Sequence, residues 1–165
     1  MILPPQHARL AGRTNDWITP KWLIDRLGPF DLDTCACTPQ PWRTAARQLT
    51  VRDDGLTRPW GRAFVWLNPP YGRQLIYWLR RMAEHNDGIA LTFARTDTRA
   101  FHRHVWPVAR TMVFLKGRLT FWRPDGCLAA NGHNSGGPSV LIGYGGPAGE
   151  RLRGCGDLGA VVRLT

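Results

Sequence analysis

The chain has 165 residues, of which 43% are hydrophobic and 21% charged, the balance of an ordinary globular domain with a sizeable core. It carries 22 Lys and Arg against 12 Asp and Glu, which gives a formal net charge of +10 at pH 7. This excess favours a polyanionic partner, with nucleic acid as the first candidate, and argues against a protein substrate. A generally basic protein without such a partner is the alternative that charge alone leaves open.

Residues 1–13 are expected to form a flexible N-terminal tail, followed by a single domain over residues 14–165. The tail contains two prolines and no long apolar stretch, so it does not read as a secretory signal. No apolar run approaches the length of a membrane span, so we expect no membrane partner. We expect a cytoplasmic protein that is either a monomer or a weak dimer. The four cysteines are interpreted as reduced thiols, and no metal site is expected. They are Cys35, Cys37, Cys127 and Cys155.

Helices and strands are predicted to alternate along the rest of the chain. Thr19 can cap the first helix, Pro20 suits its first turn, and Gly28 suits its end. Residues 37–63 read as irregular, and residues 123–138 as a long, polar, glycine-rich loop. The predicted helices cover residues 19–28, 73–85 and 99–108, and the predicted strands cover residues 29–36, 63–67, 88–94, 110–117, 139–145 and 158–164.

The alternation of strands and helices predicts an α/β fold with an open, mostly parallel sheet. In such sheets, ligands bind at the carboxyl ends of the strands. Asp33, Asn68 and Arg95 each mark the end of a predicted strand. We therefore expect these three side chains to lie along one edge of the sheet.

An unusual tetrapeptide, Asn68-Pro69-Pro70-Tyr71, follows the apolar strand at residues 63–67. Proline lacks the backbone donor that a sheet needs, so the strand must end here. The side-chain carbonyl of Asn68 and the backbone carbonyl of Pro69 could accept hydrogen bonds from an amine, while the ring of Tyr71 stacks on the base that carries it. An amine held in this way exposes its lone pair to a methyl donor. The alternative is a sharp turn with a packed tyrosine.

The sequence NPPY after an apolar strand resembles the catalytic motif of amino-methyltransferases that use S-adenosylmethionine. The wider chain resembles the short phage and prophage DNA N-6-adenine methyltransferases, a Dam-like family. NPPY alone is shared with glutamine and RNA methyltransferases, whereas the ordered set of segments is more specific. The matching segments are WITPKWLIDRL (17–27), FDLDTCA (30–36), DDGLTRPW (53–60), FVWLNPPYG (64–72), RTDTRAFH (95–102) and GRLTF (117–121).

The resemblance implies a class I, Rossmann-like methyltransferase fold in an abbreviated form, with S-adenosylmethionine as the donor. Asp33 resembles the acid near the donor, and Asp54 the residue that contacts the donor's adenine. Thr19 and Pro20 could instead merely start a helix, and Asp54 could merely build a turn. The usual glycine-rich donor loop is absent after the first strand. The implied catalytic residues are Asn68, Pro69, Pro70 and Tyr71, and the implied donor-binding residues are Trp17, Thr19, Pro20, Asp33, Asp54 and Asn68.

The expected reaction is transfer of a methyl group to the exocyclic amine of an adenine flipped out of double-stranded DNA. Positive side chains near the strand ends could hold the flanking phosphates, although a solvated basic surface is the alternative. Two other functions stay open: an RNA or protein-glutamine methyltransferase, and a nucleic-acid-binding module that has lost catalysis. The candidate DNA-binding residues are Arg73, Arg95, Arg99, Lys116 and Arg118.

Overall fold

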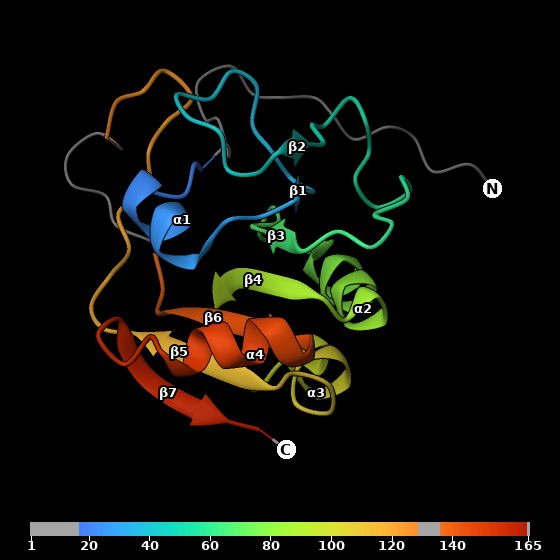
Figure 1. Ribbon diagram of the computed structural model, residues 1–165, viewed down its shortest axis with the longest axis vertical. Helices are drawn as coiled ribbons and strands as arrows, with labels where there is room; N and C mark the ends of the chain where they lie inside the picture. Colours follow the sequence, from blue (N-terminus) through green and yellow to red (C-terminus); the bar gives the residue numbers. More distant parts are fainter. Residues whose placement is uncertain (1–16, 129–135, 165) are drawn as a thin grey trace.

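The computed structural model describes residues 17–128 and 136–164 (Figure 1). The predicted N-terminal tail and the middle of the predicted polar loop lie outside the described residues. The described elements are α1 (Lys21–Leu27), β1 (Leu32–Asp33), β2 (Arg47–Gln48), β3 (Val65–Leu67), α2 (Leu75–His85), β4 (Gly88–Phe93), α3 (Arg99–His104), β5 (Thr111–Leu115), β6 (Ser139–Tyr144), α4 (Gly145–Arg153) and β7 (Gly159–Arg163).

The strands form one sheet, in the order β2-β1-β3-β4-β6-β5-β7. The first four strands in this order are parallel. Their register pairs Asp33 with Trp66 and Leu67 with Ala90. The carboxyl ends of β1, β3 and β4 therefore meet at one edge of the sheet, which we call the carboxyl edge.

The other half of the sheet is antiparallel, so the prediction of a mostly parallel sheet is wrong. β6 lies between β4 and β5 and runs against both, and β7 runs against β5. These antiparallel pairings are longer than the parallel ones. A parallel neighbour would need a crossover connection, usually a helix, and the described residues between β5 and β6, 116–128 and 136–138, contain no helix. The sheet is consequently mixed, with β5 again ending at the carboxyl edge.

Helices cover both faces of the sheet (Figure 1). On one face, α2 and α3 pack with Val65 and Leu67, the alternate residues of β3. On the other face, α1 and α4 pack with Trp66, which points the opposite way. All three β3 residues are buried, as predicted for a strand covered on both sides.

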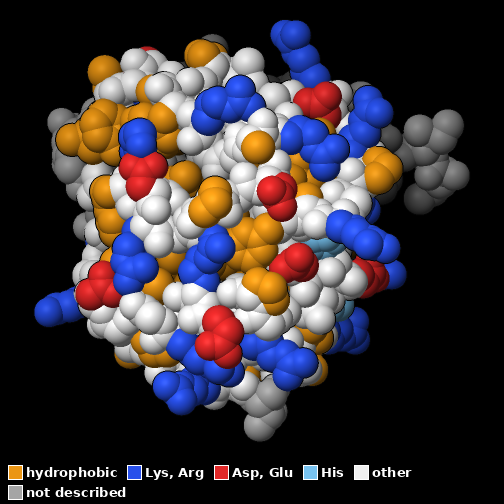
Figure 2. All heavy atoms as spheres, viewed as in Figure 1, with side chains coloured by type: hydrophobic (Ala, Val, Ile, Leu, Met, Phe, Trp, Pro, Cys, Tyr) orange, Lys and Arg blue, Asp and Glu red, His pale blue; other side chains and the backbone are white. Residues whose placement is uncertain are grey.

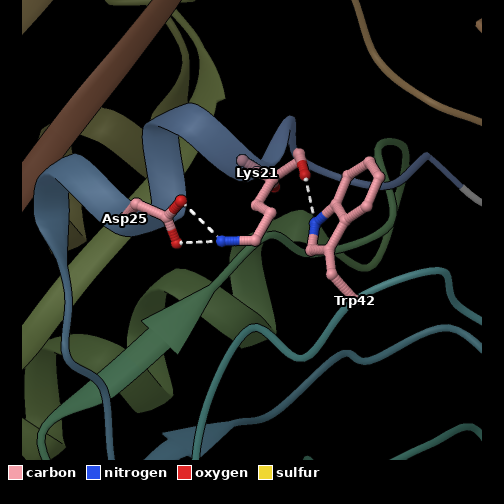
Figure 3. A network of polar contacts seen from close by, with 4 residues as sticks. Lys21, Asp25 and Trp42 are labelled. Atoms are coloured by element: carbon pink, nitrogen blue, oxygen red, sulfur yellow. Dashed lines mark hydrogen bonds and ion pairs between the residues drawn. The ribbon is translucent and has the colours of Figure 1, made fainter.

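The predicted helices and strands are present but shorter than predicted. Two elements were not predicted: α4, and β2, which lies within residues 37–63 that were expected to be irregular and pairs with β1. The proposed helix cap is also wrong. The residue at the cap position of α1 is Pro20, and no side chain caps the helix. Thr19 is turned away from α1 because its hydroxyl accepts a hydrogen bond from Asn68. Along α1, Lys21 and Asp25 form an exposed ion pair (Figure 3).

Candidate active site

The three residues that were predicted to lie along one edge of the sheet are found at the carboxyl edge. Asp33 ends β1, Asn68 follows β3 directly, and Arg95 lies two residues beyond the end of β4. Since β1, β3 and β4 are parallel neighbours, these positions lie side by side, as predicted.

The side chain of Asn68 is held by its amide nitrogen. This nitrogen donates to the backbone carbonyl of Trp17 at 3.0 Å and to the hydroxyl of Thr19 at 3.3 Å. A backbone carbonyl can only accept, so the nitrogen must face Trp17 and the amide cannot be reversed. Both amide hydrogens are therefore used, and the amide oxygen has no hydrogen-bond partner among the described residues. Asn68 presents a free acceptor in a fixed direction.

The segment that holds Asn68 is itself anchored at two points. Ile18 and Trp122 exchange two backbone hydrogen bonds, each 2.9 Å long. The indole nitrogen of Trp42 donates to the carbonyl of Thr19 at 3.1 Å (Figure 3). Residues 17–20 therefore form a fixed strap beside the loop that begins at Asn68. Trp122, the partner of Ile18, lies beyond β5 and forms an isolated antiparallel bridge with Ile18.

Tyr71 stacks on Phe93, the last residue of β4. Their ring centroids are 4.2 Å apart, and the ring planes differ by 19°. The Tyr71 hydroxyl is buried without a partner among the described residues, and this burial raises the pKa of the phenol. One face of the Tyr71 ring is thus occupied by Phe93. Sequence reasoning missed Phe93, although its place at the end of a strand neighbouring Asn68 was visible.

Asp33 is buried, with 3% of its surface exposed. One carboxylate oxygen accepts from the backbone N–H of Cys35 at 2.9 Å, and the other accepts from the hydroxyl of Thr44. Burial raises the pKa of Asp33 to about 6, while these two hydrogen bonds act in the opposite direction. No positive side chain among the described residues pairs with it. A cationic group brought close to Asp33 would therefore favour its ionised form.

Asp54 lies in a tight turn close to the end of β1. Its backbone has a positive φ of 53°, and its carboxylate accepts from the N–H of Leu56 at 3.3 Å. The next residue, Gly55, lies against the carbonyl of Thr34, where a Cβ atom would be only 2.1 Å away. Only glycine permits this approach. The turn-building alternative for Asp54 is observed, and the same turn brings Asp54 beside the strand that ends in Asp33.

Arg81, on α2, fixes the segment that carries this turn. Its guanidinium donates to the carbonyls of Leu56 at 2.6 Å and Arg58 at 2.5 Å, and it lies 4.8 Å from the ring centroid of Trp60. Trp60 in turn donates to the carbonyl of Gly55 at 2.8 Å. Sequence reasoning missed this role, because one arginine among many on a basic helix gives no signal of its own.

The five candidate DNA-binding cations are all exposed, and none forms an ion pair with a described residue. Figure 2 shows Lys and Arg side chains distributed over one face of the molecule, with fewer acidic side chains between them. The five candidate DNA-binding cations lie at different places relative to the sheet. Arg73 precedes α2, Arg95 and Arg99 follow β4, and Lys116 and Arg118 follow β5.

Other kinds of site have little support in the described part of the chain. Within residues 17–128 and 136–164, no group of three or more potential metal ligands comes together. The same residues contain no helix with the length and apolar character needed to cross a bilayer.

An Asn-Pro-Pro-Tyr loop at the carboxyl edge of an α/β sheet is typical of amino-methyltransferases. A model of the family "DNA N-6-adenine-methyltransferase (Dam)" matches residues 8–143. Because this match covers most of the chain, the protein belongs to the DNA N-6-adenine-methyltransferase family. The resemblance seen in the ordered sequence segments is thereby confirmed.

Two phage proteins named DNA N-6-adenine-methyltransferase are similar to this chain. The one from Haemophilus phage HP1 (strain HP1c1) is 31% identical over 84 residues, which cover 46% of this chain and 47% of the relative. The one from Escherichia phage T1 is 28% identical over 111 residues, which cover 63% of this chain and 46% of the relative. The chain spans about half the length of these curated relatives. No solved structure matches it.

Proposed function

We propose that this protein transfers a methyl group from S-adenosylmethionine to the exocyclic amine of an adenine flipped out of double-stranded DNA. We further propose that its mixed sheet is an abbreviated class I, Rossmann-like methyltransferase fold. The observation that carries the proposal is the orientation of Asn68. Its amide nitrogen is fixed on Trp17 and Thr19, so its oxygen is available to accept from an amine.

The catalytic loop has the groups that a poorly nucleophilic aromatic amine needs. The Asn68 oxygen and the Pro69 carbonyl, neither with a hydrogen-bond partner among the described residues, accept the two amine hydrogens. The lone pair of the amine is then drawn out of conjugation with the ring. As the amine gains positive charge during transfer, these preorganised dipoles stabilise it. The proton that the product amine must lose passes to water, so no further acid or base is required.

The residues near the end of β1 fit the proposed donor. S-adenosylmethionine, when bound, supplies a methyl group that its sulfonium has already activated. Asp33 is a buried carboxyl with no positive partner among the described residues, so a cationic ligand would compensate its burial. Asp54 lies on the adjoining turn and suits polar groups of the donor, with Trp17, Thr19 and Pro20 lining the side next to Asn68.

The exposed cations support a nucleic acid as the polymer that contains the target adenine. Arg73, Arg95 and Arg99 follow β3 and β4, next to the catalytic loop, and are free to contact the phosphates that flank a flipped nucleotide. The net charge of +10 adds a long-range attraction to DNA.

The test is incubation of the protein with methyl-labelled S-adenosylmethionine and, separately, double-stranded DNA, RNA and a mixture of proteins. We expect label in DNA, recovered as N6-methyladenine after digestion to nucleosides, and far slower labelling with Asn68→Ala. Label in RNA or protein would assign a different substrate. Salt-dependent DNA binding without any transfer would establish the binding-module alternative, which the missing glycine-rich loop after β1 favours.

A further inference from the structure

A groove lies at the carboxyl edge beyond β5, away from the catalytic loop. Its cavity volume is about 210 Å³. Its lining combines one exposed indole, three leucines and two cations. The lining residues are Trp22, Leu115, Lys116, Arg118, Leu119, Thr120 and Leu158.

The chemistry of the groove is that of a nucleotide site. Trp22 is 54% exposed although it belongs to a packed helix, and it lines the groove. Lys116 and Arg118 are exposed, and neither side chain has a partner among the described residues. A flat aromatic face beside two unpaired cations suits a base and its phosphates.

The groove is also connected to the catalytic loop by two chain segments. Trp22 lies three residues after Thr19, whose hydroxyl is 3.3 Å from the Asn68 amide nitrogen. Residues 118–120 lead to Trp122, which pairs with Ile18 in the strap. Three residues span at most about 11 Å, so Trp22 lies within roughly 20 Å of Asn68. With a rise of about 3.4 Å per nucleotide, this is on the order of six nucleotide steps or fewer.

We propose that this groove binds one unstacked nucleotide of the DNA strand near the methylated site, with its base on Trp22 and its phosphates on Lys116 and Arg118. This inference rests on the proposed function, since it assumes that DNA is the substrate. The volume is smaller than the roughly 300 Å³ at which sites for drug-sized ligands begin, so a single base fits better than a whole cofactor. A base inside a duplex has both faces covered by its neighbours, so only a base out of the stack can meet Trp22.

The test compares Trp22→Leu with Trp22→Phe, two replacements of similar size that differ in whether a ring face remains. Binding to a fluorescein-labelled single-stranded oligonucleotide and to the matching duplex is measured by anisotropy at fixed salt. Trp22→Leu should bind single-stranded DNA roughly 5- to 150-fold more weakly, the range for one stacked base worth about 1–3 kcal/mol. Trp22→Phe should retain most of the affinity. Tyr77→Ala removes another exposed aromatic ring, 59% exposed on α2, and should bind like the wild type.

Salt dependence separates stacking from charge. Trp22→Leu should leave the slope of log affinity against log salt unchanged, because stacking releases no counterions. Lys116→Gln and Arg118→Gln should each reduce the slope by about one. Thermal unfolding of each variant checks that the fold is retained. If Trp22→Leu is folded and binds like the wild type, no base stacks in the groove. If both Trp22 variants unfold, unchanged slopes for Lys116→Gln and Arg118→Gln overturn the proposal.

Methylation of the same duplex distinguishes the two proposals. If the wild type methylates DNA while the variants bind and methylate normally, the proposed function stands and the groove does not. If the wild type methylates no DNA but its binding depends on Trp22, a base still stacks in the groove, but its placement near a methylated site fails together with the proposed function.

Discussion

The amide nitrogen of Asn68 lies 3.0 Å from the backbone carbonyl oxygen of Trp17, a residue 51 positions earlier in the chain. This contact fixes which end of the Asn68 amide faces Trp17. Because the Trp17 carbonyl can only accept, it turns the Asn68 oxygen away from the strap. The loop that begins at Asn68 is therefore joined by hydrogen bonds to the strap over residues 17–20, and the strap is joined to Trp122 in turn.

Asn68→Ala should lower the rate of methyl transfer much more than it weakens binding. The Asn68 oxygen acts most strongly as positive charge develops on the amine, so its loss costs about 3–4 kcal/mol in the transition state, or roughly 100- to 1,000-fold in rate. The measurement is single-turnover methylation of an adenine-containing duplex, with donor and DNA affinities measured separately. Transfer at the wild-type rate would mean that the loop is only a turn.

Asn68→Asp is the informative companion to that variant. A carboxylate still offers an acceptor to the substrate amine, but it has no hydrogen to donate to the Trp17 carbonyl. The side chain then loses its fixed orientation, and two oxygens face one another. We expect a rate between those of the wild type and Asn68→Ala. A rate equal to that of the wild type would show that the contact with Trp17 is not required for orientation.

Tyr71→Phe should preserve activity and make the protein more stable. The hydroxyl of Tyr71 is buried without a partner among the described residues, so removing it should raise the free energy of unfolding by about 1 kcal/mol. The ring face and its stack on Phe93 remain. Denaturant unfolding and a methylation assay measure the two effects. Tyr71→Ala serves as the control, since it should lose both the stack and the capture of the base, and a large loss of activity in Tyr71→Phe would assign a role to the hydroxyl.

The positions of the helices and strands near the candidate site were predicted from the sequence more accurately than the order and direction of the strands in the sheet. An apolar run ended by proline located β3, a second apolar run located β4, and helical spacing located α2. The direction of β6 was not predictable, because periodicity defines a strand without defining its neighbours. Its reversal follows from a polar connection whose course is not encoded in any local pattern.

The helix α4 was missed for a local reason. It begins Gly145-Gly146-Pro147 and contains Gly149, and glycine normally disfavours a helix. In the structure, a Cβ atom on Gly149 would be 2.8 Å from the Cβ atom of Arg110, so the small residue allows the helix to lie close to the sheet. Tertiary packing has overridden propensity here. The partners of Asn68 were likewise unpredictable in detail, since the contact with Trp17 joins distant parts of the chain.

The stability of the protein should fall as the pH rises through the pKa of Asp33. In the folded protein this pKa is about 6, against 3.8 for the free side chain, because burial disfavours the charged form. Between these values the folded state holds a proton that the unfolded state has lost, so stability decreases with rising pH. The contribution of Asp33 is fully present below pH 3.8 and is lost above about pH 6. The full difference is about 3 kcal/mol.

Comparison with Asp33→Asn isolates this effect, because asparagine has similar size, its amide oxygen can still accept from Cys35, and its amide nitrogen can donate to the hydroxyl of Thr44. Urea unfolding at several pH values should show the wild type losing stability relative to Asp33→Asn between pH 4 and 6. A cationic donor should favour the ionised form, so donor affinity measured by calorimetry should rise over the same interval in the wild type alone. Parallel stability curves for the two proteins would contradict the shifted pKa, and equal donor affinities would remove Asp33 from the donor site.

Arg81→Met should destabilise the protein and weaken donor binding, because Arg81 joins α2 to the turn that carries Asp54. Methionine retains part of the apolar stem but leaves the carbonyls of Leu56 and Arg58 without their donor. Hydrogen bonds from a charged donor contribute about 1.5–3 kcal/mol each when buried, and these are partly exposed, so we expect a total loss of about 2–3 kcal/mol.

The neighbouring Arg80 provides a matched control. It forms only an exposed ion pair with Glu84, so Arg80→Met should change the free energy of unfolding by less than about 0.5 kcal/mol. The free energy of unfolding in denaturant and the donor affinity by calorimetry are measured for both variants. If Arg81→Met behaves like Arg80→Met, the contacts of Arg81 with the segment that carries Asp54 do not contribute to stability or donor binding.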